Sequence, residues 1–206
     1  MPPKLFRKQK TAKKVKTQST KPQLRDVVKS SYGHKTAIKK LENLGFKKDS
    51  ELSNHNQSVF YSPEHKRAIV SIAGTHNMSD VLTDIGFAFT GNVKNTDRYK
   101  QAEETYRKTR EKYKPESVSI ASHSLGGAIG SELPLLDPRD RIVTYNKASH
   151  PLFSKTKSHE INTRAFGDLV SLASKFHPRT ITFSHHQLNP LGAHSSDALK
   201  DLNFEL

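Results

Sequence analysis

The segment from 118 to 127 constrains the fold more than any other part of the chain. A short apolar run, 118–121, leads into the sequence SHSLGG over 122–127. This order is typical of a strand that turns sharply into a helix, with Ser124 on the turn at the carboxyl edge of a parallel sheet. Because backbone segments approach closely at such a turn, the residues two before and two after the serine must be small. Gly126 meets this requirement, and Ser122 stands where the usual pattern has glycine.

Apolar runs and helical patterns alternate on both sides of this turn. The run AIVSIA at 68–73 is continuously apolar, as expected for a parallel strand that is buried on both faces. Strands that alternate with helices predict an α/β fold with a mostly parallel sheet. The sequence predicts strands at 46–49, 57–62, 68–73, 117–122, 141–145 and 160–166, short apolar segments at 169–173 and 180–184, and helices at 33–45, 78–90, 96–113, 125–133 and 196–203.

The 206-residue chain has a net charge of +14, which is unevenly distributed. Residues 1–21 contain eight lysines and arginines and no acidic residue. A segment with this charge and almost no apolar periodicity is expected to be disordered. We therefore predict a basic disordered arm over 1–22 and a folded domain over 23–206, with the boundary near 22–30. The arm is expected to attract a polyanion (nucleic acid, an acidic partner or an anionic bilayer), and a solubilising or targeting tail is the alternative.

The composition also limits the kinds of site that the chain can build. Without cysteine, it has no disulfide, no thiolate nucleophile and no cysteine metal ligand. No apolar stretch is long enough to span a bilayer, and the N-terminus lacks the apolar segment of a secretory signal. These features predict a soluble protein that stays inside the cell.

A serine on a sharp turn becomes a nucleophile when a base removes its proton, and a carboxylate usually orients that base. In folds with this turn, the chain order is serine, acid, histidine. Asp168 is the best candidate acid because it follows a predicted strand on a glycine-containing turn. Asp137 and Asp140 are alternatives in the proline-rich stretch after the predicted helix 125–133. The other interpretation of Asp168 is a turn aspartate that caps backbone groups.

Four histidines follow the candidate acid, and His194 is the best candidate base. It lies in a predicted loop just before the last predicted helix, where the base of such a site is expected. His123, beside the candidate nucleophile, is predicted to be a packed residue rather than a participant. A metal site at the adjacent histidines 185 and 186 is not expected, because neighbouring strand residues point to opposite faces. The alternative bases are His177, His185 and His186.

Acyl transfer also requires hydrogen-bond donors that face the developing oxyanion. One donor is expected to be the backbone N–H of Leu125, the residue after the candidate nucleophile. A second should come from a loop that follows an earlier strand. Thr75 fits this place because Gly74-Thr75 ends the predicted strand 68–73. Its backbone N–H, and also its hydroxyl, could then face the oxyanion.

The segment 77–91 directly follows this predicted oxyanion loop and carries an apolar stripe at helical spacing. An apolar helix at the mouth of a site is a candidate for lipid contact. Ordinary core packing is the alternative, because helical apolar stripes usually face the core. The apolar residues concerned are Met78, Val81, Leu82, Ile85, Phe87 and Phe89.

Over roughly residues 34–200 the chain resembles the class 3 lipases, the fungal triacylglycerol lipase-like branch of the α/β-hydrolases. The order and spacing of four blocks carry this resemblance. These blocks are 72–75 (IAGT), 80–85 (DVLTDI), 122–127 (SHSLGG), and Gly167-Asp168 followed by His194-Ser195.

The resemblance implies an α/β-hydrolase fold and a role for each candidate residue. Ser124 would be the nucleophile, Asp168 the triad acid and His194 the base, while Thr75 and Leu125 would form the oxyanion hole. In the family, the helix after the oxyanion residue is a lid, and 77–91 match its position. The implied activity is hydrolysis of lipid esters, acylglycerols or phospholipids, at a membrane or micelle surface, without a cofactor or a metal.

The chain departs from the family pattern at several points. Ser122 replaces a glycine, and Ala73 stands where an arginine is common before the Gly-Thr pair. The domain is short for the family, so its acyl-binding loops are expected to be trimmed. This compact form resembles lipase-like proteins encoded by DNA viruses and other intracellular genomes, which implies a location inside a cell or with a virion.

Two rival functions fit the same residues. The first is a soluble-ester or thioester hydrolase that uses the same triad. The second is a catalytically inactive lipase-like protein that binds a nucleic acid or a protein partner through residues 1–21. Activity that does not rise at a micelle surface would favour the first, and salt-sensitive polyanion binding by the arm would favour the second.

Overall fold

The computed structural model describes residues 20–76, 93–148, 158–172, 178–184 and 189–206. Within these ranges, seven strands form one sheet whose spatial order follows the chain from β1 to β7. The first three strands pair antiparallel, and the strands from β3 to β7 pair parallel. The strands are β1 Lys47–Asn54, β2 Gln57–Ser62, β3 Arg67–Ile72, β4 Ser117–His123, β5 Arg141–Tyr145, β6 Glu160–Ala165 and β7 Thr180–Phe183.

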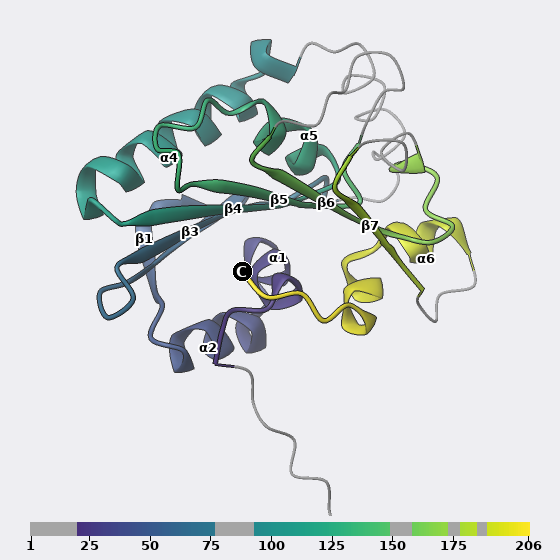
Figure 1. Ribbon diagram of the computed structural model, residues 1–206, viewed down its shortest axis with the longest axis horizontal. Coiled ribbons are helices and arrows are strands. Elements are labelled where there is room, and N and C mark those ends of the chain that lie inside the picture. The colour runs from purple at the N-terminus through teal and green to yellow at the C-terminus, as the bar shows by residue number, and fades with distance from the viewer. Residues whose placement is uncertain (1–19, 77–92, 149–157, 173–177, 185–188) are drawn as a thin grey trace, which may run out of the picture.

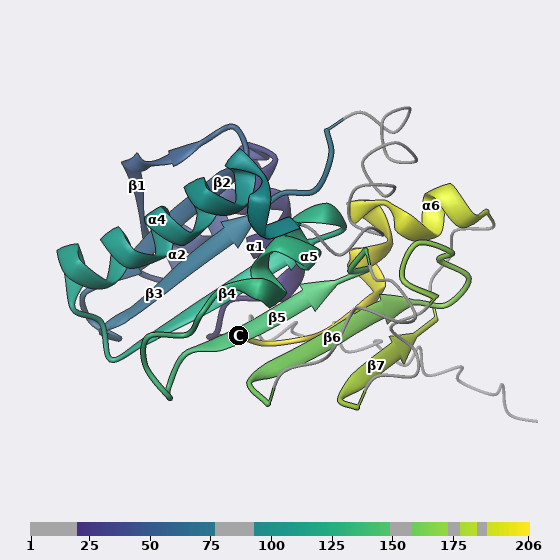
Figure 2. The same cartoon turned by 90° about the horizontal axis from the view of Figure 1, so that it is seen from above.

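Helices cover both faces of this sheet (Figure 1). The helices α1 (Leu24–Ser31) and α2 (Lys35–Asn43) lie against one face, and α4 (Asp97–Tyr113) and α5 (Leu125–Glu132) lie against the other. Viewed from above, the parallel strands run toward the side of the molecule where α6 (Pro190–His194) lies (Figure 2). The carboxyl ends of these strands therefore share one edge of the sheet. The remaining short helices are η1 Val93–Asn95 and η3 Ser196–Asp201.

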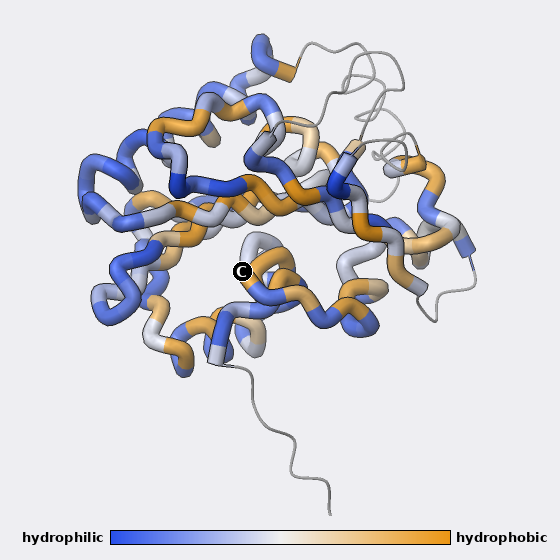
Figure 3. The backbone as a smooth tube through the Cα atoms, in the orientation of Figure 1, coloured by the Kyte–Doolittle hydropathy of each residue, from blue (hydrophilic) through white to orange (hydrophobic). Residues whose placement is uncertain are grey.

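The central strands are apolar on both faces because helices cover them from both sides. In Figure 3 hydrophobic stretches follow these strands, whereas the outer turns of α4 are hydrophilic. Two buried clusters result. The cluster beneath α4 and α5 includes Val70, Ile120 and Ile129, and the cluster on the other face includes Ile69 and Val143.

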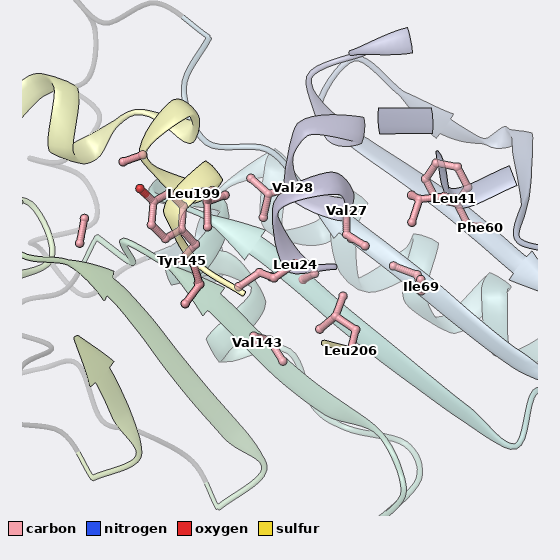
Figure 4. Packing of buried hydrophobic residues seen from close by; sticks show 14 of the residues in the cluster. Leu24, Val27, Val28, Leu41, Phe60, Ile69, Val143, Tyr145, Leu199 and Leu206 are labelled. Atoms are coloured by element: carbon pink, nitrogen blue, oxygen red, sulfur yellow. The ribbon is translucent and has the colours of Figure 1, made fainter. Parts of the chain in front are cut away.

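Helix α1 occupies the stretch in which the sequence predicts the boundary between arm and domain. Leu24, Val27 and Val28 stand at helical spacing and are fully buried. In Figure 4 they point toward the strand residues Ile69 and Val143. No helix is predicted here from the sequence, whereas a single apolar stripe is enough to fold these polar residues against the sheet. The division of the chain at residue 22 stays a prediction.

Two further elements differ from the prediction. Strand β1 extends over Lys47–Asn54 instead of 46–49. It is polar because it lies at the edge of the sheet, where pairing with β2 rather than burial fixes it. The predicted last helix 196–203 is a 3-10 helix over Ser196–Asp201, and α6 precedes it. Among the described residues, no helix combines the length and the apolar character that crossing a bilayer would require.

Candidate active site

Ser124 stands between β4 and α5, on the sharp turn that the sequence predicts. Its backbone has φ 53° and ψ −123°, a conformation that residues with a Cβ rarely adopt. The turn brings α5 very close to β3. A Cβ added to Gly126 would contact the Ala73 carbonyl oxygen and would lie 2.5 Å from that of Ile72. Only glycine fits at that position, which explains the small residue two places after Ser124.

Ser122 occupies the other small-residue position and packs against a glycine of the helix. A Cβ added to Gly130 would lie 2.9 Å from Ser122 Oγ and 3.4 Å from Ser122 Cβ. The buried Ser122 hydroxyl has no hydrogen-bond partner among the described residues. The serine is therefore accommodated because the facing helical residue, Gly130, lacks a side chain.

The structure brings the three predicted catalytic residues together. His194 Nε2 lies 2.8 Å from Ser124 Oγ, and His194 Nδ1 lies 3.0 Å from Asp168 Oδ1. All three residues are buried, with exposed fractions of 2% for Ser124, 1% for Asp168 and 2% for His194. Because a carboxylate only accepts, Nδ1 carries the proton, and Nε2 is left to accept from the serine hydroxyl.

Asp168 follows β6 and is held by its own turn. Its carboxylate accepts hydrogen bonds from the Val170 N–H (3.1 Å), from the Ser171 N–H (3.1 Å) and from the Ser171 hydroxyl. Burial raises the pKa of the Asp168 carboxyl, but the hydrogen bond and the charge of His194, together with these donors, outweigh burial and lower it. Asp168 is therefore oriented and ionised where it meets His194.

The main chain around His194 is also fixed by polar contacts. Asn146 Nδ2 donates to the Ala193 carbonyl at 2.7 Å, and Asn146 Oδ1 accepts from the Ala165 N–H at 2.8 Å. Tyr145 Oη lies 2.9 Å from the Ser195 carbonyl oxygen. These contacts tie the end of α6 to β5 and β6. His194 ends α6 and does not lie in a loop as predicted, although it still precedes the last helix.

Three features together decide the architecture. A serine stands on a strained turn at the carboxyl edge of a mostly parallel sheet, an acid follows a later strand, and a histidine follows the last strand. The fold is that of an α/β-hydrolase.

Solved structures of fungal lipases are similar to this α/β-hydrolase in fold. The Rhizomucor miehei lipase propeptide complex is 12% identical, with a TM-score of 0.49, over 72% of this chain and 60% of that one. The lipase from Rhizopus microsporus var. chinensis is 18% identical, with a TM-score of 0.48, over 72% and 66%. A triacylglycerol lipase from Penicillium expansum is 18% identical, with a TM-score of 0.44, over 85% and 84%.

This chain spans less than two thirds of the length of the Rhizomucor and Rhizopus lipases. No model of a known protein family matches the sequence. A comparison with curated proteins gives no match either.

The two predicted oxyanion donors belong to segments that adjoin Ser124. Leu125 is the first residue of α5, where backbone N–H groups and the helix dipole favour negative charge. Thr75 is half-buried and directly follows Gly74. A Cβ added to Gly74 would lie 2.7 Å from Ser124 Cβ, so this loop runs against the turn of the hydrolase fold. Arg98 Nη2 donates to the Ala73 carbonyl at 2.6 Å and thereby holds the loop from its other side.

The alternative acids lie at the opposite edge of the sheet. Asp140 accepts from the Val118 N–H at 2.7 Å, at the start of β4, and Asp137 pairs with Arg139 at 2.8 Å. Neither is near Ser124. The alternative bases His177, His185 and His186 lie outside the described residues, as do the proposed lipid contacts Met78, Val81, Leu82, Ile85, Phe87 and Phe89. Among the described residues, no group of three His, Asp or Glu side chains could hold a metal ion.

Two side chains next to these residues carry no signal in the sequence. Tyr32, just after α1, hydrogen-bonds to both Gly74 and His123. Arg98, near the start of α4, binds the loop that carries Thr75. No local motif marks either residue, because each reaches the site from a distant part of the sequence.

Large apolar side chains are exposed around the acid. Phe166, Leu169 and Leu172 have exposed fractions of 70%, 64% and 43%. They flank Asp168 on the segment that follows β6, at the same edge of the sheet as Ser124. Within the described residues, these three exposed side chains form an apolar rim at the carboxyl edge of the sheet. The polar residues of the site itself are buried.

Proposed function

We propose that this protein is a serine hydrolase that cleaves carboxylic ester bonds of lipids through an acyl-enzyme. The hydrogen-bonded path from Ser124 Oγ through His194 to Asp168 is the observation that carries the proposal. A hydroxyl, an imidazole and a carboxylate in this order activate a serine for attack on a carbonyl carbon.

In the proposed reaction, Ser124 Oγ attacks the ester carbonyl carbon while His194 Nε2 takes the hydroxyl proton. Asp168 orients the imidazole and stabilises the imidazolium that forms. The N–H groups of Thr75 and Leu125 stabilise the oxyanion. His194 then protonates the leaving alcohol, and a water molecule, deprotonated by the same nitrogen, hydrolyses the acyl-enzyme.

The lipid preference rests on the surroundings of the site. The apolar rim of Phe166, Leu169 and Leu172 suits contact with acyl chains more than with water. We propose that the apolar residues of 77–91 contact lipid and that acylglycerols or phospholipids are the substrates. The fungal proteins that are similar in fold are lipases, one of them a triacylglycerol lipase.

Hydrolysis of p-nitrophenyl butyrate and of phospholipid–detergent mixed micelles tests this proposal. We expect the unsubstituted protein to be active and Ser124→Ala to lose about 10⁴-fold or more in kcat. Ser122→Ala is the matched control, because it removes a neighbouring buried hydroxyl that has no partner among the described residues. Full activity of Ser124→Ala would overturn the proposed nucleophile.

The same assay tests the role of Asp168 and the class of substrate. Asp168→Asn should keep the fold and lose about 10⁴-fold in kcat, because the imidazole loses its orienting acceptor. A rate that does not rise from monomeric to micellar substrate would indicate a soluble-ester or thioester hydrolase instead. If neither substrate is cleaved, labelling of Ser124 by a fluorophosphonate probe would indicate the proposed site with other substrates, and absence of labelling would contradict the hydrolase proposal.

A further inference from the structure

A chain of hydrogen bonds runs behind the Ser124 turn and links three distant segments. The Gly74 N–H donates to Tyr32 Oη at 2.8 Å. Tyr32 Oη lies 2.6 Å from His123 Nδ1, and His123 Nε2 lies 2.8 Å from the His194 carbonyl oxygen. Tyr32 follows α1, Gly74 follows β3, and His123 ends β4. The path thus connects the loop that carries Thr75 to the main chain of His194.

Chemistry fixes the direction of the two outer hydrogen bonds in this path. The amide at its first end, Gly74, can only donate, and the carbonyl at its last end, His194, can only accept. The hydroxyl oxygen of Tyr32 therefore accepts from Gly74, and His123 carries a proton on Nε2. In a neutral imidazole Nδ1 is then the acceptor, and the Tyr32 hydroxyl donates to it. A protonated His123 would reverse this middle bond, because Nδ1–H would donate to Tyr32 Oη.

The packing around His123 is consistent with a neutral ring. His123 stacks on the Tyr145 ring at a centroid distance of 5.1 Å, and the His194 ring lies 5.1 Å away on another side. Burial, and after it the charge of the nearby His194 ring, lowers the pKa of His123 to about 3, against smaller raising effects of the hydrogen bond to His194 and the charge of Asp168. Burial also raises the pKa of Tyr32 to about 12, so its hydroxyl keeps the proton.

The path ends at two parts of the proposed catalytic machinery, the loop with the oxyanion donor Thr75 and the base His194. Gly74 lies against Ser124 and directly precedes Thr75, the proposed oxyanion donor. Because the Gly74 N–H is bound to Tyr32, the donor on this loop has to come from Thr75. The other end holds the carbonyl of His194, the proposed base. A shift at either end would change the distance between the oxyanion donors and the base.

We propose that Tyr32 and His123 are positioning residues that set the oxyanion loop and the base relative to each other. The inference rests on the proposed hydrolase function. Neither side chain touches the substrate: each acts through the backbone group at its end of the path. Their contribution should be greatest in the transition state, when the oxyanion and the imidazolium form together.

Kinetics of Tyr32→Phe, expressed per titrated active site, test this inference. Phenylalanine keeps the ring but removes the hydroxyl that joins Gly74 to His123. We expect kcat to fall about tenfold with little change in KM, because one buried hydrogen bond that positions the reacting groups is lost. Tyr113→Phe is the matched control. Its hydroxyl donates to Asp49 at 2.8 Å, away from Ser124, so its kcat should match that of the unsubstituted protein.

Two substitutions of His123 test the two halves of the path separately. His123→Gln keeps a donor near the Nε2 position for the His194 carbonyl, whereas His123→Asn keeps an acceptor near the Nδ1 position for Tyr32. We expect each to retain more kcat than His123→Ala. If the role were only structural, the variants would lower the melting temperature and the fraction of titratable sites, while kcat per site stayed unchanged. That outcome would overturn the inference.

A nuclear magnetic resonance measurement on Ser124→Ala tests the path without any turnover. The ¹⁵N signals of His123 should show a proton on Nε2 and none on Nδ1 from pH 8 to pH 5, and Tyr32→Phe should shift the Nδ1 signal. A His123 ring that becomes fully protonated by pH 5 would contradict the inference. Because this readout needs no substrate, failure of the path and failure of the hydrolase proposal are distinguishable.

Discussion

Ser124 adopts a strained backbone conformation because its neighbours leave it no other. Its N–H donates to the Tyr145 carbonyl at 3.1 Å, and its carbonyl accepts from the Gly127 N–H at 2.9 Å and the Ala148 N–H at 3.1 Å. A non-glycine residue in this conformation costs about 1–3 kcal/mol. The surrounding hydrogen bonds offset that cost, and the hydroxyl is thereby directed at His194 instead of into the helix.

The burial of His123 gives the folded protein a defined dependence on pH. The pKa of His123 falls from an ordinary 6.5 to about 3 because burial disfavours the charged ring, with the His194 charge as the second cause. Below pH 6.5 the unfolded chain binds a proton that the folded protein does not bind. The contribution of His123 to stability is therefore complete above pH 6.5 and is lost as the pH falls toward 3.

Urea unfolding at pH 7.5 and pH 5 measures this contribution. Between these two pH values we expect the unsubstituted protein to lose about 2 kcal/mol more stability than His123→Asn, which cannot take up the proton. All other titratable residues are present in both proteins, so their contributions largely cancel in the comparison. Equal losses in the two proteins would show that His123 is not held neutral by the fold.

The packing of α5 on β4 depends on a complementary pair of small residues. Where the usual turn has a glycine in the strand, this chain has Ser122, and Gly130 faces it from the helix. The Ser122 side chain on the strand thus takes the space that a side chain at position 130 of the helix would otherwise fill. The second contact of the same helix is different, because Gly126 faces backbone carbonyl oxygens of β3 and of Ala73 that cannot move aside.

A double-mutant cycle tests this complementarity. Gly130→Ala alone should destabilise the protein by about 1–3 kcal/mol, because its methyl group would overpack against Ser122. Combined with Ser122→Gly, the same methyl group would fill vacated space, and alanine favours the helix over glycine by about 1 kcal/mol. We expect the double variant to recover most of the loss in urea unfolding. Gly126→Ala is the control, and recovery of that variant by Ser122→Gly would contradict the explanation.

The two ends of the described chain are joined by hydrogen bonds beside α1. The Leu24 N–H donates to the Phe204 carbonyl at 2.8 Å, and the Leu206 N–H donates to the Pro22 carbonyl at 2.9 Å. Leu206 is buried in the same cluster as Leu24 (Figure 4). Helix α1 is thus fixed between the sheet and the last residues of the chain, and Tyr32, which follows it, reaches Gly74 from a fixed position.

The basic arm contributes to the net charge of the whole molecule and contains none of the proposed catalytic residues. Residues 1–19 hold seven of the lysines and arginines and no acid, so their removal changes the net charge from +14 to +7 (14 − 7 = 7). We expect this deletion to weaken binding to anionic phosphatidylglycerol vesicles and to reduce the salt dependence of binding. Vesicle co-sedimentation at several salt concentrations measures both effects.

Hydrolysis of p-nitrophenyl butyrate is the control for the deletion, and its rate should stay the same because the substrate is uncharged and monomeric. Unchanged vesicle binding would contradict a membrane role of the arm. Loss of binding to duplex DNA, with vesicle binding intact, would instead support the nucleic-acid interpretation.

The sequence alone was sufficient to predict the α/β arrangement and the meeting of Ser124, Asp168 and His194. This was possible because strands and helices have characteristic apolar periods, and because the small residues around Ser124 mark a turn that few other structures require. Helix α1 is not predicted although Leu24, Val27 and Val28 have helical spacing, because this short apolar stripe adjoins a strongly charged arm. The length of β1 is not predicted because a polar edge strand has no apolar alternation.

Tertiary structure alone decided which distant side chains support the site. Tyr32 and His123 are 91 positions apart, and no local pattern relates them. The pairing of Ser122 with Gly130 likewise appears only when the helix lies on the strand. Short-range periodicity is a property of the sequence itself, so it determined the elements and the turn. Hydrogen bonds between segments arise only when packing brings them within reach, so the fold determined how the predicted residues are held.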